Sequence, residues 1–557
     1  MLAKTGFTPG LNHRKELQPH THRLKQAAAP RRRCIRVYAE NGKNVVIVGG
    51  GWAGFGAAKH LSECGYNTTL LDAKSNPGGL SSGFRTKKGQ AVEAGIKGFW
   101  YSYKNIFKLV EELNLPEWPF TDWTNSGFWS PKGLVTEAPV FSRQAQLPTF
   151  LGQSVHTVGL HWSISLPDRL TMIPFLGSFF DYNTNEETYK EYDSMSAYEL
   201  YRRTGVSREA YEQFLRPTLL VGLFAPPESV SAAVMLETLW YYVMAHQNYF
   251  DVCWCKGSVA ERIFAPLVQR IRGRGGKVHG NQLVTSLNIE EIDGVPQVTA
   301  VEATDRETGE TTIHQADAVV LAVGINAMQK LITANPPLAA QNDFSNIMHL
   351  KSLDVIATRL FFDRPVPTKY PANVLSGFEP AAGATFFNLN EIQDEYRNAE
   401  GSVITVDFYN ASALLPLTDE ALIQRVRSHL EKCEPGFKGA KVVDSVVLRY
   451  PNAVTHFSPG SYPDRPFQTT SIPNIMMAGD WVRGLQHDAA GLSQERALVS
   501  GLSAANLVVE RLGGGEPATI LDADPDEPHV ALTRQLVTQT RRVTSFPEIL
   551  GLRNPFL

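Results

Sequence analysis

The sequence predicts an α/β protein, and three patterns along the chain carry that prediction. A buried strand at 44–48 runs into a glycine-rich turn and a helix, and a second strand follows at 68–71. Strands at 319–323 and 475–478 have the same unbroken apolar character, which is typical of parallel strands covered on both faces. Helical stretches within 131–254 and mixed strands and helices within 331–465 predict a second, α+β part.

Composition limits the class of protein. A chain of 557 residues is too long for one hydrophobic core, so we expect more than one domain. The net charge is −3, and acids outnumber bases after residue 39, which argues against a nucleic-acid partner. The five cysteines form no disulfide framework in so long a chain, and they predict a reducing compartment. We interpret Cys253 and Cys255 as packing residues and expect no metal site.

The first 39 residues resemble an address signal. They are rich in Arg and poor in acids, and they end in a run of small and basic residues before Ala39. This pattern predicts an organelle transit peptide, with the plastid (chloroplast) as the expected destination and the mitochondrion as the alternative. The segment contains no serine, so a disordered basic tail is the other interpretation.

The first strand, turn and helix form a dinucleotide-binding pattern. The turn reads Gly49-x-Gly51-x-x-Gly54, and an acid, Asp72, closes the second strand. Gly49 permits the tight turn, Gly51 lets the backbone approach a pyrophosphate, and Gly54 lets helix and strand pack closely. The helix N-terminus supplies amide donors to the phosphates, and Asp72 is placed to accept from a ribose hydroxyl.

Two further features favour FAD as the dinucleotide. An acid after the second strand suits an unphosphorylated ribose, which leaves FAD or NAD. The pair Gly78-Gly79 follows shortly after Asp72 and predicts a second backbone approach to a long ligand. Asp480 follows the strand at 475–478 and precedes a helix at 493–511, where it suits a flavin ribityl chain.

These regions, in this order, resemble the FAD-dependent amine-oxidase superfamily, and most of all its plant-type phytoene and zeta-carotene desaturases. Blocks at 92–97, 222–231, 260–268 and 478–481 carry the likeness beyond the fingerprint. The resemblance implies a Rossmann-type FAD-binding domain built from separated segments, a mixed α+β substrate domain, and a C-terminal extension. The expected boundaries are 43–130, 255–330 and 466–515 for the FAD domain, 131–254 and 331–465 for the substrate domain, and 516–557 for the extension.

The resemblance also implies roles for single residues. It places the ADP half of FAD on Gly49, Gly51, Gly54 and Asp72, the adenine against the backbone of Val284, the ribityl chain on Asp480, and the phosphate and ring side against Gly78 and Gly79. Arg262 matches a position near the flavin, where a cation would stabilise the reduced ring; a surface ion pair is the alternative. His456 is a second catalytic candidate, with a packed loop histidine as the alternative.

The chain departs from the desaturase pattern at three positions. Leu80 stands where those proteins carry a cation, and Arg85 lies five residues on. Lys97 replaces a histidine, and Arg496 replaces a glycine expected near the flavin ring. These departures put the substrate in more doubt than the cofactor.

We therefore expect an FAD-dependent oxidoreductase, a desaturase or isomerase acting on a carotenoid-like or other hydrophobic isoprenoid. The alternatives are an amine or porphyrinogen oxidase of the same fold, or a flavin-binding protein without catalysis. No second nucleotide fingerprint follows the strand at 319–323, so a quinone or oxygen would reoxidise the flavin. The apolar stretch 150–180, broken by prolines, predicts either a buried helix pair or a hydrophobic surface that meets a bilayer peripherally.

Overall fold

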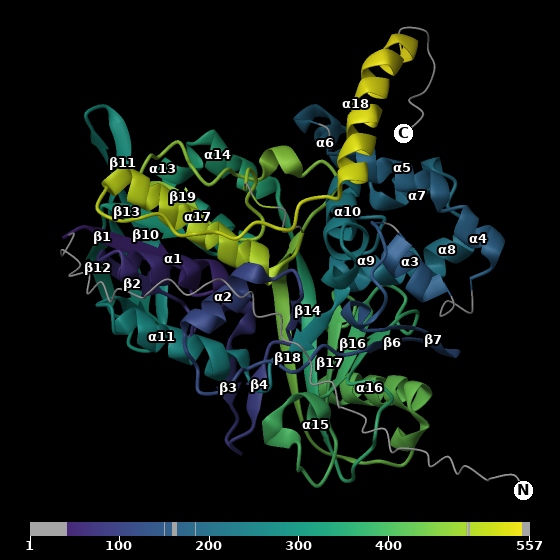
Figure 1. Ribbon diagram of the computed structural model, residues 1–557. Helices are drawn as coiled ribbons and strands as arrows, with labels where there is room; N and C mark the ends of the chain where they lie inside the picture. Colours follow the sequence, from purple (N-terminus) through teal and green to yellow (C-terminus); the bar gives the residue numbers. More distant parts are fainter. Residues whose placement is uncertain are drawn as a thin grey trace, which may run out of the picture. The chain divides into compact units, whose positions relative to one another are not determined.

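The computed structural model describes residues 42–149, 151–158, 164–183, 185–485, 487 and 491–548, and they belong to one compact unit (Figure 1). The expected transit peptide, 1–39, lies outside the described residues. None of the described helices is long and apolar enough to cross a membrane.

The first sheet is parallel throughout and confirms the predicted α/β class. Its strands lie in the order β19 (Ile475–Met477), β13 (Ala318–Leu321), β1 (Asn44–Val48), β2 (Asn67–Leu71) and β9 (Lys277–His279). Because the strands are parallel, their carboxyl ends meet at one edge of the sheet, and loops from distant parts of the sequence converge there.

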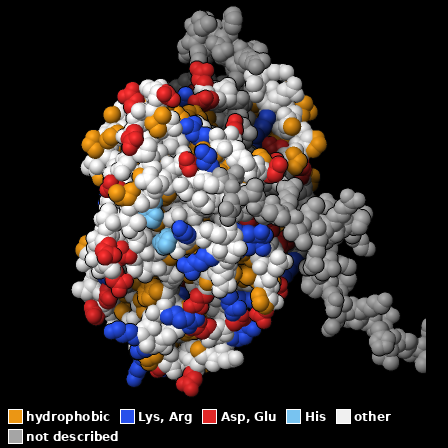
Figure 2. Space-filling view, turned by 90° about the vertical axis from the view of Figure 1, so that its left-hand side faces the viewer, with side chains coloured by type: hydrophobic (Ala, Val, Ile, Leu, Met, Phe, Trp, Pro, Cys, Tyr) orange, Lys and Arg blue, Asp and Glu red, His pale blue; other side chains and the backbone are white. Residues whose placement is uncertain are grey.

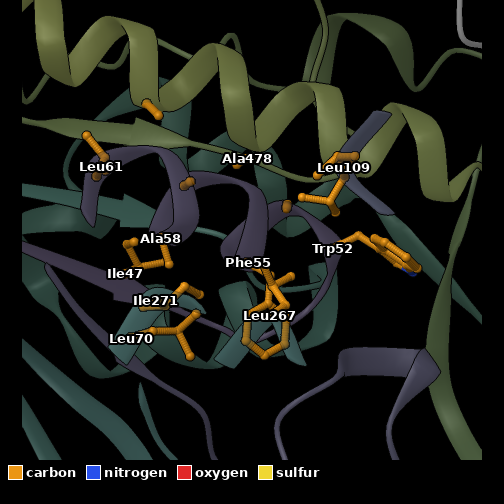
Figure 3. Close-up of a cluster of buried hydrophobic side chains, with 14 of the residues drawn as sticks. Ile47, Trp52, Phe55, Ala58, Leu61, Leu70, Leu109, Leu267, Ile271 and Ala478 are labelled. Atoms are coloured by element: carbon orange, nitrogen blue, oxygen red, sulfur yellow. The ribbon is translucent and has the colours of Figure 1, made fainter. Parts of the chain in front are cut away.

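Alternate residues of β1 face two different layers. Val45 and Ile47 pack against the helices α1 (Trp52–Glu63), α11 (Ala265–Arg272) and α17 (Gln494–Leu512). Figure 3 shows Phe55, Ala58 and Leu61 of α1 among the side chains of this core. Val46 and Val48 pack on the opposite side against the antiparallel sheet β10 (Gln282–Ile292), β11 (Val295–Asp305) and β12 (Thr311–Gln315). The strand is buried on both faces, which explains its unbroken apolar run.

A seven-stranded sheet forms the floor of the second part. Its order is β18 (Val442–His456), β14 (Lys351–Phe362), β17 (Val403–Tyr409), β16 (Gly383–Asn388), β15 (Ala372–Leu375), β6 (Ser126–Ser130) and β7 (Gly133–Ala138). The expected FAD segment extended to residue 130, but β6 belongs to this sheet, so the boundary falls before it. The physical reason is Trp129, which is buried in the core of this sheet beneath α16 (Asp419–Cys433).

Short helices enclose the other side of the second part around one hydrophobic core. The C-terminal helix α18 (Pro528–Glu548) joins them, because Val530 is buried in the same core. Figure 2 views a different face, on which charges of both signs mix with scattered hydrophobic side chains. The helices of this layer are α3 (Leu151–Val158), α4 (Leu166–Leu170), α5 (Ile173–Asp181), α6 (Glu186–Asp193), α7 (Ala197–Arg203), α8 (Arg208–Ala210), α9 (Arg216–Gly222) and α10 (Ala232–Leu239).

Candidate active site

One cavity of about 1930 Å³ connects the carboxyl edge of the parallel sheet to the seven-stranded sheet and the helices. At its first end lie the turn after β1, the residues after β2, and the loop after β19. At its far end lie side chains of α5, α9 and β15. We call these the dinucleotide end and the distal end.

The glycine turn is built by close backbone packing. Gly49 has a φ of 102°, and a Cβ there would lie 2.5 Å from the carbonyl oxygen of Ala322. A Cβ on Gly54 would lie 1.8 Å from the carbonyl oxygen of Gly49. Helix α1 has no side-chain cap and no acid in its first turn, so its positive end is left for an anion. This geometry suits a pyrophosphate.

Asp72, at the end of β2, is hydrogen-bonded to the glycine turn that follows β1. Its Oδ2 accepts from the Gly50 amide at 2.6 Å, and its Oδ1 accepts from the Lys74 amide at 2.7 Å. A carboxylate has about four acceptor sites, so two remain for ribose hydroxyls. Asp72 lines the cavity, as its predicted role requires.

The glycine pair approaches the fingerprint turn directly. Gly79 has a φ of 56°, and a Cβ there would lie 3.0 Å from the Cα of Gly51. Both Gly78 and Gly79 line the cavity. The two glycine loops therefore lie in direct backbone contact at the cavity wall, and a side chain on Gly79 would push them apart.

A cation near the glycine pair comes from an earlier position of the same loop. Arg85 does not supply it, because its Nη2 forms ion pairs with Glu261 at 2.7 Å and Glu395 at 3.2 Å, outside the cavity lining. Lys74 lines the cavity, and its Nζ donates to the carbonyl oxygen of Gly79 at 2.9 Å. Burial lowers the pKa of Lys74. A positive charge therefore stands at the glycine pair despite Leu80.

The remaining predicted cofactor residues come from distant segments. Val284 lines the cavity beside a β-bulge, since the β10–β11 register shifts between Val284 and Ser286. Such a bulge leaves backbone groups out of the ladder and available to a ligand. Asp480 also lines the cavity, and its Oδ1 accepts from the Thr455 hydroxyl at 3.1 Å. Burial raises the pKa of Asp480 to about 6.

Neither predicted catalytic side chain lines this cavity. Arg262 lies on the outer side of a helical turn whose Ala260, Ile263 and Phe264 face inward; its Nη2 is 3.2 Å from Asp394 Oδ2, and its side chain is 40% exposed. The Nε2 of His456 is 2.8 Å from the Ser229 carbonyl oxygen, and burial lowers the pKa of the ring. Both therefore match their alternatives, a partly exposed ion pair and a packed histidine.

Arg496 points away from the cavity. Its Nε donates to the carbonyl oxygen of Asp480 at 2.8 Å, and its Nη2 donates to that of Val482 at 2.8 Å. It therefore braces the loop that carries Asp480. This contact explains why a long cation is accommodated where the desaturases have a glycine.

Two buried charges in the cavity wall were not singled out as catalytic from the sequence. Lys97 lines the cavity, and its Nζ donates to the carbonyl oxygens of Ala94 at 2.6 Å and Gly95 at 3.1 Å. Asp407, from β17, also lines it, and burial raises its pKa to about 7. The signal for Asp407 was an acid inside the otherwise uncharged and largely apolar run of 403–409.

The distal end is walled mainly by apolar and aromatic side chains. Phe224 adopts a φ of 57°, which is uncommon for a bulky residue. Its ring stacks on Tyr409 with centroids 3.9 Å apart. Among the other residues of this wall are Phe175, Leu176, Phe179, Phe214, Leu219 and Val221.

The pattern of the flavin containing amine oxidoreductase family matches residues 52–509. The chain belongs to this family. Its cofactor is FAD, and the two glycine loops, Asp72 and Asp480 around one cavity fit that group. A probable zeta-carotene desaturase of Synechococcus elongatus is 24% identical over 488 residues, which cover 84% of this chain and 98% of that protein.

Further relatives agree on the family. A chloroplastic/chromoplastic 15-cis-phytoene desaturase of Glycine max is 24% identical over 482 residues, covering 84% of this chain and 79% of that protein. Among solved structures, the cyclohexylamine oxidase of Brevibacterium oxydans has a TM-score of 0.60 at 14% identity, covering 85% of this chain and 99% of that one. This likeness confirms the fold of the flavin oxidoreductases.

Proposed function

We propose that this FAD-dependent oxidoreductase is a desaturase or isomerase of a carotenoid-like or other hydrophobic isoprenoid. The observation that carries the proposal is the single cavity that runs from the dinucleotide end into a largely apolar distal end. A long polyene offers few groups for hydrogen bonds, so its recognition depends on burying apolar surface against such walls.

The protein's residues position the two partners of the reaction. FAD, when bound, supplies two-electron oxidation chemistry. Asp72 and Asp480 would hold its ribose and ribityl hydroxyls, and Lys74 places a positive charge at the glycine pair. Phe175, Leu176 and Phe179 exclude water from the distal end and align an apolar chain.

A bilayer is the proposed source of the substrate. Helices α3, α4 and α5 carry large apolar side chains that are more than half exposed, from 52% at Val155 to 68% at Leu166. We call this set the α3–α5 apolar surface: Leu151, Val155, Leu166, Leu170 and Ile173. The same helices line the cavity through Gln153, Arg169 and Leu176. Exposed apolar side chains beside a cavity mouth support peripheral membrane contact.

The remaining proposals concern the acceptor and the compartment. A membrane quinone could reach the flavin from the same surface, so we propose it as the electron acceptor. Relatives of this chain include a phytoene desaturase named as chloroplastic. That relationship supports the plastid as the destination of the chain.

The stacked pair Phe224 and Tyr409 does not form an open aromatic cage for an amine. Two facing rings can hold a protonated amine only if a gap separates them. Here the centroids are 3.9 Å apart and the rings are inclined by 17°, so they fill the space themselves.

Anaerobic reduction of the purified holoenzyme tests the substrate class. Carotenoid precursors in detergent micelles should bleach the oxidised-flavin absorption, or be isomerised without net bleaching, as product analysis would show. Bleaching by an amine or a porphyrinogen, with no conversion of any polyene, would contradict the proposal.

Sedimentation with lipid vesicles tests the membrane contact. The double substitution Leu166→Asp/Leu170→Asp should reduce vesicle binding at least tenfold, because two charges must then enter the interface. The matched control is Ile313→Asp/Val443→Asp, which changes two apolar residues of similar exposure on β12 and β18. Equal losses in both variants would show that the α3–α5 apolar surface is not the contact.

A further inference from the structure

We propose that Asp407 is the proton acceptor of the oxidation carried out in this cavity, and that Lys97 stabilises its carboxylate form. The inference deepens the proposed function, since it rests on a substrate that loses a proton. The ionisation of Asp407 beside the FAD cavity does not depend on which substrate that is.

The backbone of β17 directs Asp407 to the cavity. Val406 and Phe408 are buried in the core under α16, and the alternate residues Thr405, Asp407 and Tyr409 face the other way. Asp407 and Tyr409 line the cavity. The Asp407 side chain is therefore a polar group on the cavity wall, although the residue is only 5% exposed.

One carboxylate oxygen of Asp407 accepts a hydrogen bond, and the other has no hydrogen-bond partner. Oδ2 accepts from the Ile96 amide at 3.0 Å, and a Cβ on Gly95 would lie 2.7 Å from that oxygen. Oδ1 is buried and has no hydrogen-bond partner. A buried carboxylate oxygen without a partner costs free energy, and such costs persist in proteins mostly where the group has a function.

Burial and the charged groups around Asp407 shift its pKa into a range suited to proton exchange. Glu93 lies at the end of β4 (Ala91–Glu93), and Arg359 lies on β14. Lys97 lies in the turn that follows β4. Burial is the largest influence and raises the pKa of Asp407 to about 7, against the lowering effect of Lys97 and Arg359. Tyr409 and Tyr450 are the other titratable neighbours, and burial raises the pKa of both phenols, which therefore stay neutral.

Within this cluster, only Lys97 and Asp407 are both charged and on the cavity wall. Glu93 accepts from the Val259 amide at 3.1 Å and the Gln393 side chain at 3.2 Å, and Arg359 donates to Ala91 and Thr405. Neither Glu93 nor Arg359 lines the cavity. The two outer charges therefore support the inner pair, whose residues line the cavity.

With Asp407 as the proton acceptor, both hydrogens removed in a desaturation are accounted for. Two hydrogens would leave adjacent carbons of the substrate: one would leave with its electron pair, which FAD, when bound, would accept, and the other would leave as a proton. The electron pair of the second C–H bond becomes the new C=C bond, and the proton binds the free oxygen of Asp407. General bases are most effective with a pKa near the working pH, which is the range in which Asp407 titrates.

The visible spectrum of the holoenzyme gives a test that needs no substrate. Titration from pH 5 to 9 should shift the FAD absorption bands with a midpoint near 7 in the wild type. The midpoint should vanish in Asp407→Asn, which keeps an oxygen to accept from Ile96. Asp251→Asn is the matched control: this buried carboxylate accepts from the Phe141 and Ser142 amides but does not line the cavity. An unchanged titration in Asp407→Asn would overturn the inference.

Stopped-flow reduction by the polyene supplies the second readout. Asp407→Asn should lower the rate of FAD reduction by about 10²–10⁴-fold with the FAD content unchanged, and the pH dependence of the remaining rate should lose its step near 7. A wild-type rate in Asp407→Asn would overturn the inference. Failure of the proposed function looks different, because the wild type itself would then convert no polyene while its spectral titration remained.

Discussion

The two ends of the cavity are lined by different parts of the chain, backbone at one end and side chains at the other. At the dinucleotide end the walls are largely backbone, where Gly49 packs against Ala322 and Gly54 against Gly49 at distances no side chain allows, and Gly79 lies directly against Gly51. At the distal end the walls are side chains from α5 and α9. Substitutions at the dinucleotide end would therefore change its backbone shape. Substitutions at the distal end can change the cavity lining while the fold of the chain stays the same.

This difference explains where the chain departs from its relatives. Leu80 carries no charge, but Lys74, six residues earlier in the same loop, places a cation at the glycine pair. Arg496 stands where the resemblance to the desaturases implies a glycine, and its side chain turns away to the carbonyls of Asp480 and Val482. Function at the dinucleotide end thus depends on backbone shape and charge more than on single side chains.

Gly54→Ala should have the largest effect and tests the backbone end. The new methyl group would lie 1.8 Å from the Gly49 carbonyl oxygen, so helix and turn must separate. We expect a loss of stability of more than about 4 kcal/mol and loss of bound FAD, measured by thermal unfolding and by the 450/280 nm absorbance ratio. Gly222→Ala is the control, since nothing lies within 4 Å of its added Cβ. Similar behaviour of both variants would break the comparison.

Lys74→Met should have the next largest effect. It removes the charge at the glycine pair and the donor to Gly79, which at about 1.5–3 kcal/mol corresponds to at least about tenfold weaker FAD binding, measured by fluorescence quenching. Adding Leu80→Lys, the family's own arrangement, should restore most of the affinity. If the double variant binds no better than Lys74→Met, the charge is not what matters there.

Asp480 predicts a smaller, pH-dependent effect at the same end. Burial raises the pKa of this carboxyl to about 6, so it is protonated below that pH and accepts hydrogen bonds from ribityl hydroxyls best above it. FAD affinity should therefore fall as the pH drops through 6, by up to about tenfold per pH unit, because each unit is about 1.4 kcal/mol. Asp480→Asn should bind more weakly at pH 8 and show no such fall. A pH-independent affinity in the wild type would contradict this role.

Leu176→Trp should leave FAD binding within about 0.5 kcal/mol of the wild type, because Leu176 lines only the distal end. The larger ring should shorten the space for an apolar chain, so conversion of long polyenes should fall while shorter analogues are retained. Product analysis with polyenes of graded length measures this. Loss of FAD from the variant would show that the two ends are coupled.

Local sequence patterns predicted much of the dinucleotide end. The strand, turn, helix and acid at 44–72 all form, and seven of the eight predicted cofactor residues line the cavity, with Gly54 packed beneath the turn. Their contacts with FAD remain predictions. The catalytic candidates fared worse, because Arg262 depends on which side of a short helical turn faces inward and His456 on how a strand end meets a distant loop.

The sequence by itself determined the α/β class, the glycine turn and the acid that closes it, because these depend on contacts within some thirty residues. Only the tertiary structure decided that Arg496 turns away from the cavity. It also decided that Asp407 accepts from the Ile96 amide, 311 positions earlier in the chain, in the turn that carries Lys97. No local pattern encodes such meetings. The contact of Asp407 with Ile96 follows from the pairing of β14, β16 and β17 and from the packing of the 93–98 turn onto that sheet. Burial at this contact then shifts the pKa values of Asp407 and Lys97.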